Sequence, residues 1–244
     1  MSKIRVGIVS YRNTKPLLLG LQQAPIASSI HLVPDYPSRL ANMLANGEID
    51  LGLIPVAAIP DLPQHHIIGR HCIATEGEIA SVALFSDVPL DKVDRVYLDY
   101  QSRTSAALLQ YLIREYWGIQ PEIVRATDEG YRDLIAGTTA GLVIGDRAFE
   151  QRKRSTYIYD LGSEWRALTG LPFVFAVWVS TRPLPQSFVD AFDAANAIGL
   201  SRIDDIVEQE DFRLFDLRKY YRLHLSYQLD DRKRKAIERF LEVM

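Results

Sequence analysis

The stretch that decides the fold lies near the start of the chain and reads Val6-Gly7-Ile8-Val9-Ser10-Tyr11-Arg12-Asn13-Thr14-Lys15-Pro16-Leu17-Leu18. An apolar strand ends in a polar loop, and a helix with an early proline follows at once. In α/β proteins, ligands bind outside the carboxyl ends of strands, where helix N-termini present unpaired N–H groups. Ser10, Tyr11, Asn13 and Thr14 are therefore candidates to face a small anionic ligand. The alternative is a plain strand-to-helix turn in which Thr14 is an N-cap.

The composition is that of a globular protein, with 48% hydrophobic and 24% charged residues among 244. No run approaches the roughly 18 apolar residues of a membrane-spanning helix. The strand pattern begins by Ile4, which leaves no room for a signal peptide. The single cysteine, Cys72, excludes an internal disulfide, and we interpret it as a buried small hydrophobe. We therefore expect a cytoplasmic protein with no membrane partner.

The charge pattern gives no sign of a nucleic-acid partner. The net charge is −3, and the basic run Arg232-Lys233-Arg234-Lys235 sits among acidic residues, as a solvated helix face does. The histidines His65, His66 and His71 lack metal-ligand spacing, and we expect them on the surface or in loops. The chain has no glycine-rich phosphate loop and no zinc motif. We therefore expect no metal, nucleotide or other cofactor, while the oligomeric state stays open.

Strand-like and helix-like segments alternate along the chain, which indicates an α/β protein with a mostly parallel sheet and helices on both faces. Strands are expected at Ile4–Val9, Ile30–Val33, Ile49–Pro55, Ile79–Phe85, Val96–Leu98, Glu122–Arg125, Gly141–Ile144 and Phe173–Ser180. Helices are expected at Ser38–Asn46, from Leu108 to Tyr116, at Asp128–Ala136, over Gln186–Glu208 and onward to Met244.

One sheet does not account for the whole pattern. A second strand–loop–helix unit, nearly repeating the first, reads Val96-Tyr97-Leu98-Asp99-Tyr100-Gln101-Ser102-Arg103-Thr104-Ser105. We therefore expect two α/β lobes joined by two connections, with a hinge and a cleft lined by one strand-to-helix loop from each lobe. Lobe 1 is expected to comprise residues 1–88 and 178–244, and lobe 2, inserted into it, residues 89–177.

Six stretches of the sequence occur in the order found in one known family. They are Val9-Ser10-Tyr11-Arg12-Asn13-Thr14-Lys15-Pro16-Leu17, Gly47-Glu48-Ile49-Asp50-Leu51-Gly52-Leu53-Ile54-Pro55-Val56, Ala80-Ser81-Val82-Ala83-Leu84-Phe85-Ser86, Leu98-Asp99-Tyr100-Gln101-Ser102-Arg103-Thr104-Ser105, Leu142-Val143-Ile144-Gly145-Asp146 and Thr169-Gly170-Leu171-Pro172-Phe173-Val174-Phe175-Ala176-Val177-Trp178. On these stretches, which cover most of the chain, it resembles the menaquinone-biosynthesis family that includes chorismate dehydratase. Arg12 departs from the family pattern, which has an aliphatic residue there.

The resemblance implies a two-lobed fold like that of type II periplasmic binding proteins, with a hinge and an interlobe cleft. It also implies a hydro-lyase of the futalosine route that removes water from chorismate without a cofactor, giving 3-(1-carboxyvinyloxy)benzoate. The sister 1,4-dihydroxy-6-naphthoate synthase typically opens with a Ser-Pro-Cys-Pro-Asn-Asp-like loop, which this chain lacks. A non-catalytic protein that binds small carboxylates is the alternative from a different class.

The implied substrate carries two carboxylates, and charge builds on the ring carboxylate as the C3 proton leaves. Donors that bind this carboxylate more tightly as charge develops accelerate the step. Given the resemblance, Ser102, Thr104 and Ser105 are suited to this, because helix-start N–H groups and the helix dipole add to their hydroxyls. Capping and packing are the alternative roles. Arg103 is a candidate to pair with a carboxylate or to form an inter-lobe salt bridge.

No residue stands out as a general base. We expect Asn13 to orient the substrate by hydrogen bonds, and the enolpyruvyl carboxylate of the substrate to remove the C3 proton itself. Ser81 is expected to bind the ring carboxylate or to assist the departing hydroxyl. Tyr11 either lines the site or packs as an ordinary aromatic residue.

Two acidic residues just past strand ends are alternative bases. They are Asp99 and Asp146. Asp146 has two alternative roles, which are contact with the substrate and N-capping of the helix that follows it.

Overall fold

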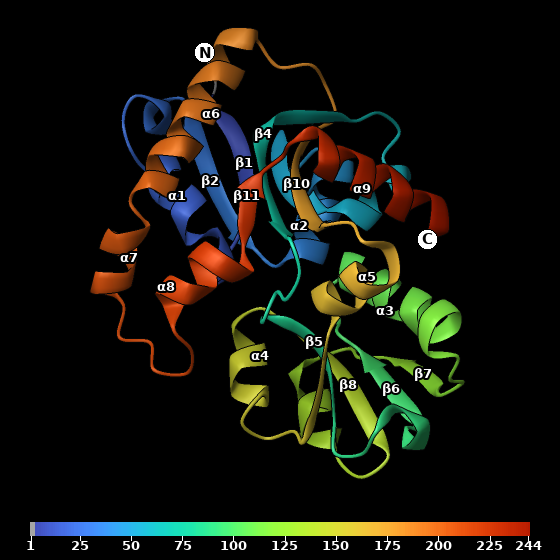
Figure 1. The fold of residues 1–244 in the computed structure, drawn as a ribbon. Helices are drawn as coiled ribbons and strands as arrows, with labels where there is room; N and C mark the ends of the chain where they lie inside the picture. The colour runs from blue at the N-terminus through green and yellow to red at the C-terminus, as the bar shows by residue number, and fades with distance from the viewer. Residues whose placement is uncertain (1–2) are drawn as a thin grey trace.

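The computed structural model describes residues 3–244, which form two lobes, one above the other in Figure 1. The strands are β1 (Ile4–Val9), β2 (Ile30–Asp35), β3 (Leu51–Pro55), β4 (His66–Thr75), β5 (Val82–Ser86), β6 (Arg95–Leu98), β7 (Glu122–Arg125), β8 (Thr139–Ile144), β9 (Tyr157–Asp160), β10 (Phe173–Ser180) and β11 (Ser226–Gln228). The upper lobe holds a six-stranded sheet of order β11-β4-β10-β3-β1-β2, and the lower lobe holds a five-stranded sheet of order β7-β6-β8-β5-β9.

Helices surround both sheets. They are α1 (Lys15–Leu21), α2 (Pro37–Ala45), α3 (Thr104–Leu112), α4 (Asp146–Gln151), α5 (Leu161–Thr169), α6 (Gln186–Ser201), α7 (Ile203–Gln209), α8 (Leu217–Lys219) and α9 (Asp231–Val243). Two π-helical turns, Ile113–Trp117 and Tyr220–His224, extend α3 and α8. Within residues 3–244, no helix has the length and apolar character needed to cross a membrane.

Both sheets are mixed, so the expected mostly parallel sheet is wrong. In the upper sheet β1 pairs in parallel with β2 and β3, whereas β10 is antiparallel to β3 and β4, and β11 to β4. In the lower sheet β6 is parallel to β7 and β8, whereas β5 is antiparallel to β8 and β9. Strands β5 and β10 come directly after the two segments in which the chain crosses from one lobe to the other. Each of these strands runs antiparallel to both of its neighbours in the sheet.

The sheets divide the chain earlier than the expected lobe boundaries do. The expected boundary places residues 79–88 in lobe 1, yet β5 (Val82–Ser86) pairs with β8 and β9 in the lower sheet. The whole of β10 (Phe173–Ser180) lies in the upper sheet, although the expected boundary places residues 173–177 in lobe 2. The reason is that the chain leaves the upper sheet directly after β4 ends at Thr75.

The sequence pattern missed β4, β9 and β11. Strand β4 lies between β10 and β11, although Gly69, Arg70 and His71 interrupt its apolar run. Asp193 of α6 makes these polar residues compatible with a sheet, because it accepts the Arg70 N–H at 2.8 Å and contacts His71 Nδ1 at 3.0 Å. His71 is therefore buried, contrary to the expected surface or loop position.

Two expected helices differ from the observed elements. The segment Gln186–Glu208 is broken at Arg202, where α6 ends and α7 begins with Asp204 and Asp205 in its first turn, which favours a new helix start. The segment Asp128–Ala136 is a short 3-10 helix at Glu129–Leu134, started by the Asp128 carboxylate accepting the Gly130 N–H at 2.9 Å.

Helices α1 and α6 pack with their backbones in close approach. A Cβ atom at Gly20 of α1 would overlap the Ala195 carbonyl of α6, and one at Gly199 of α6 would overlap the Pro16 carbonyl of α1. Only glycine therefore fits at these two crossing positions. Because α1 follows the loop after β1, this packing fixes the loop that carries the candidate site.

The crossing back to the upper lobe is held by aromatic packing. Trp165 of α5 lies 5.3 Å from the Phe173 ring and 6.0 Å from the Phe240 ring of α9, and its indole N–H donates to the Pro172 carbonyl at 3.0 Å. The basic run at the start of α9 is not simply a solvated face. Lys233 is 3% exposed, and its Nζ lies 2.8 Å from a Glu76 oxygen beside the first crossing.

Candidate active site

A pocket lies between the two lobes. Its polar lining consists of Tyr11, Asn13, Thr14, Ser81, Ser102, Thr104 and Ser105. Its apolar lining consists of Val9, Pro37, Pro55, Ile73, Ile79, Val82, Ile144, Gly145, Phe175 and Ala176. Seven of the eleven candidate site residues from the sequence thus line one cavity. The two strand-to-helix loops meet here, as the sequence predicts.

Asn13 sits on the 3-10 turn directly after β1, and it presents a free acceptor. Its Oδ1 is buried and has no hydrogen-bond partner within residues 3–244. Its backbone carbonyl accepts the Tyr227 hydroxyl at 2.8 Å, which holds the turn in place. A buried amide oxygen without a partner is costly, and such groups are concentrated at functional sites. The amide of Asn13 is therefore available to a ligand.

Thr14 and Tyr11 shape the same loop. The Thr14 hydroxyl lies 2.5 Å from the Val9 carbonyl and 2.8 Å from the Tyr11 carbonyl, so it stabilises the loop rather than capping α1. The Tyr11 hydroxyl contacts the Gln101 side-chain oxygen of the other lobe, and its ring lies against Gly145. Burial raises the pKa of Tyr11 well above its ordinary value, so the phenol is neutral.

Ser81 lies in a tightly held loop at the first crossing between the lobes. Ala80 has a positive φ of 64°, a strained conformation for a residue with a side chain. Asp160 accepts the Ala80 N–H at 2.8 Å, and Arg152 donates to the Ala80 carbonyl at 2.7 Å. The Ser81 hydroxyl accepts from the Tyr220 hydroxyl at 2.7 Å. These contacts fix the serine at the edge of the pocket.

The second strand-to-helix loop reaches the pocket at the start of α3. The hydroxyl groups of its serine and threonine residues make different contacts. Ser102 caps the helix by accepting the Ser105 N–H at 3.0 Å. Thr104 joins the lobes, since its hydroxyl donates to the Phe175 carbonyl at 3.0 Å and accepts the Ala57 N–H at 3.2 Å. Ser105 is 3% exposed and lines the cavity. The first turn of a helix also leaves N–H groups without acceptors in the helix, and these suit an anion.

Four candidate residues lie outside the pocket lining, and Ser10, Arg103 and Asp146 are three of them. Ser10 is exposed and faces a different surface hollow. Arg103 forms the inter-lobe salt bridge that the sequence left open, with its guanidinium 2.9 Å from Asp61 and 2.5 Å from the Asn42 side-chain oxygen. Asp146 is not an N-cap, because Gly145 occupies that position and the Asp146 carboxylate is bound to Arg12.

The alternative base Asp99 is enclosed in the lower lobe. Its carboxylate accepts from the Tyr131 hydroxyl at 2.9 Å and from Arg147 Nη2 at 2.6 Å, and it also accepts the N–H groups of Gln101 and Ile144 at 2.9 and 3.2 Å. A carboxylate that accepts this many bonds and does not line the cavity is a structural group.

The chemical character of the cavity follows from its lining. Among the described residues that line it, Tyr11 alone has an ionisable side chain, and that side chain is neutral. The cavity offers hydroxyls, one amide and a helix start within an apolar shell. Such a site can bind and orient an anion, but its lining side chains supply no carboxylate or imidazole to take up a proton.

Sequence reasoning missed four residues that position the site. Gln101 and Gly145 lie within quoted motifs, so the motifs themselves could have indicated them. Tyr220 and Tyr227 lie in the C-terminal segment, where no motif marks them, and only the fold brings them behind Ser81 and Asn13.

The two lobes, the two crossings and the pocket between them define a protein of the periplasmic-binding-protein fold. The alkanesulfonate-binding protein SsuA of Xanthomonas axonopodis pv. citri, bound to MOPS, is similar with a TM-score of 0.67 at 15% identity, over 98% of this chain and 91% of that one. A Candida albicans protein described as having the generic periplasmic binding protein fold has a TM-score of 0.66 at 14% identity, over 100% and 90%. A protein of Archaeoglobus fulgidus has a TM-score of 0.81 at 14% identity, over 99% and 96%.

Comparison of the sequence identifies the family of this protein, whereas comparison of the structure identifies only the fold. The model of the menaquinone biosynthesis family matches residues 4–244, and the chain belongs to this family. The chorismate dehydratase of Thermus thermophilus is 30% identical over 98% of this chain and 94% of that relative. The family and the fold class predicted from the sequence are confirmed.

Proposed function

We propose that this protein is a chorismate dehydratase of menaquinone biosynthesis, a hydro-lyase that converts chorismate into 3-(1-carboxyvinyloxy)benzoate. Membership of the family and the similarity to the Thermus thermophilus enzyme support the reaction. The observation that carries the mechanism is the pocket between the lobes, whose described lining residues hold donors for carboxylates and only one, neutral, ionisable side chain. This composition suits a substrate that has two carboxylates and serves as its own base.

In this mechanism the substrate's enolpyruvyl carboxylate takes the proton from C3. The electrons of that bond move into the ring, the C4 hydroxide leaves and takes up the proton from the carboxyl group to form water, and the ring becomes aromatic. No oxidant or reductant is needed, because the step is an elimination. The unpaired Asn13 amide orients the substrate so that its carboxylate reaches C3.

The ring carboxylate is bound by the start of α3 and by a serine. Ser105 and the helix N–H groups stabilise the charge that develops on this carboxylate. Ser81 donates a hydrogen bond from its hydroxyl to the same carboxylate or to the departing hydroxyl. The inter-lobe contacts of Thr104 and Arg103 hold the lobes together around the substrate and exclude water.

The experiment is incubation of the purified protein with chorismate alone, with the loss of chorismate absorbance and the product mass recorded. We expect a product lighter by one water, formed with chelator present and no nucleotide added. Tight binding of chorismate without turnover would contradict the enzyme and favour a carboxylate-binding protein. Absence of binding would overturn the proposal and direct tests to the sister naphthoate-forming reaction.

A further inference from the structure

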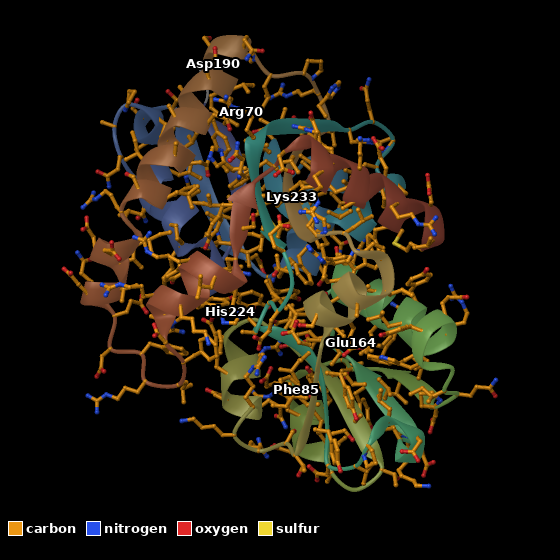
Figure 2. All side chains as sticks on the ribbon, viewed as in Figure 1. Arg70, Phe85, Glu164, Asp190, His224 and Lys233 are labelled. Atoms are coloured by element: carbon orange, nitrogen blue, oxygen red, sulfur yellow. The ribbon has the colours of Figure 1, made fainter. Side chains whose placement is uncertain are left out.

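Tyr220 contacts Ser81 but does not itself line the pocket. It begins the π-helical turn Tyr220–His224, is 1% exposed, and its ring packs edge-on against Phe149 of α4 at 5.0 Å. Figure 2 shows His224, on the same turn, between the two lobes, and its Nδ1 lies 3.2 Å from the Glu78 carbonyl of the first crossing. The turn is thus packed against the loop that carries Ser81. Such π-helical turns are often found at functional sites.

The protons of the Tyr220–Ser81 contact can be assigned. The two hydroxyl oxygens are 2.7 Å apart, and within residues 3–244 neither side chain has another hydrogen-bond partner. Burial raises the pKa of Tyr220, so the phenol keeps its proton at neutral pH. In this contact the Tyr220 hydroxyl donates and Ser81 Oγ accepts. The hydroxyl proton of Ser81 is then not used in this contact. Because Ser81 lines the pocket, this proton is available to a ligand there.

We propose that Tyr220 is a positioning residue for the reaction, whose hydrogen bond fixes the Ser81 hydroxyl so that Ser81 donates its own proton into the pocket. The inference rests on the proposed function and deepens it. Tyr220 does not line the pocket, and it acts through Ser81. A hydroxyl that accepts one hydrogen bond is a stronger donor in the next, because hydrogen bonds in a chain polarise one another.

The neighbouring residue supplies a matched control. Tyr221 is also 1% exposed, and its buried hydroxyl has no partner among the described residues. Tyr220→Phe and Tyr221→Phe therefore remove the same atom from adjacent buried rings, but only the first removes a hydrogen bond. We expect Tyr220→Phe to lower kcat roughly tenfold with KM changed less than about threefold, since the lost donor acts mainly in the transition state. Tyr221→Phe should retain the wild-type kcat.

A double-mutant cycle separates positioning from general support of the fold. If Tyr220 acts through Ser81, adding Tyr220→Phe to Ser81→Ala costs no further activity under single-turnover conditions. A structural role would instead lower activity in both backgrounds and in both phenylalanine variants. All variants are compared well below their melting temperatures, which are recorded alongside.

The outcomes distinguish the two proposals. A wild-type protein that does not convert chorismate overturns the proposed function and this inference with it. If the wild type is active and Ser81→Ala is impaired, but Tyr220→Phe matches Tyr221→Phe, the inference alone is overturned. A selective kcat loss in Tyr220→Phe that disappears in the Ser81→Ala background supports it.

Discussion

The carboxylate of Asp146 accepts two hydrogen bonds from Arg12, one from the backbone N–H at 3.1 Å and one from the guanidinium at 2.9 Å. Arg12 follows β1 in the upper lobe, and Asp146 begins α4 in the lower lobe. The guanidinium also lies 3.2 Å from Glu210 and 4.0 Å from the centre of the Phe212 ring. Arg12 therefore joins the two lobes beside the pocket.

Replacing Arg12 by leucine should weaken the closed arrangement of the lobes. The ion pair is 24% and 30% exposed, so its loss costs about 1 kcal/mol, enough to raise KM for chorismate about three- to tenfold. Steady-state kinetics and small-angle scattering with and without substrate would check this. Arg39→Leu, which removes a pair with Asp35 inside one lobe, is the control. An unchanged KM in Arg12→Leu would show that the contact does not contribute to closure.

Replacing Asn13 by alanine should abolish most turnover and leave the fold intact. The amide oxygen of Asn13 is buried and has no partner among the described residues, and loss of one polar contact to a reacting group typically lowers kcat by about 100-fold or more. Ser10→Ala is the matched control, because Ser10 lies three residues earlier, exposed and outside the lining. Turnover and circular dichroism are measured for both. Equal activity in the two variants would remove Asn13 from the mechanism.

Much of the fold could be predicted because its strands are short apolar runs with clear ends. Strands β1, β7 and β10 have the predicted limits. Strand β4 could not be recognised, because its polar residues are stabilised by Asp193, more than 100 positions away in the sequence. The antiparallel orientation of β10 could not be predicted either, because the local sequence pattern does not indicate which strand β10 pairs with.

The candidate site was predictable where it is built from local loops. The loops around Asn13 and Ser105 follow strand ends, and both line the cavity. The different contacts of the Ser102, Thr104 and Ser105 hydroxyls could not be predicted. The Thr104 hydroxyl, for example, donates to the Phe175 carbonyl of the other lobe, which is distant in the sequence. Likewise, nothing in the sequence around Tyr227 indicates its contact with Asn13.

Asp50 should make the stability of the upper lobe depend on acid pH. The hydrogen bond from Arg5 lowers the pKa of Asp50 below its usual 3.8. A carboxyl whose pKa is lower in the folded state contributes stability above its unfolded pKa and loses it as the pH falls through the folded value. Asp50→Asn should therefore be less stable than the wild type at pH 7, with the difference shrinking below about pH 4.

Denaturant unfolding at a series of pH values checks this prediction for Asp50. Asp91→Asn, at an exposed carboxylate whose Oδ2 lies 3.5 Å from Lys92, is the control variant. A difference for Asp50→Asn that does not change between neutral and acid pH would contradict the assigned pKa.

Gly145 should tolerate no side chain, for two separable reasons. Its backbone has φ 67° and ψ −150°, a region open almost only to glycine, and an added Cβ would lie 2.9 Å from the Tyr11 ring. Gly170 has a similar φ of 71°, but a Cβ there meets nothing within 4 Å among the described residues. Gly170→Ala should therefore lower the free energy of unfolding by about 1 kcal/mol, and Gly145→Ala by about 2–5 kcal/mol.

The activities of the two glycine variants should differ as well. In Gly145→Ala the Tyr11 ring must move, and the contact of its hydroxyl with Gln101 of the other lobe is lost. We expect reduced kcat/KM in Gly145→Ala, measured at a temperature where both variants are folded, and wild-type kinetics in Gly170→Ala. Normal kinetics in a folded Gly145→Ala protein would mean that the position of the Tyr11 ring does not matter for turnover.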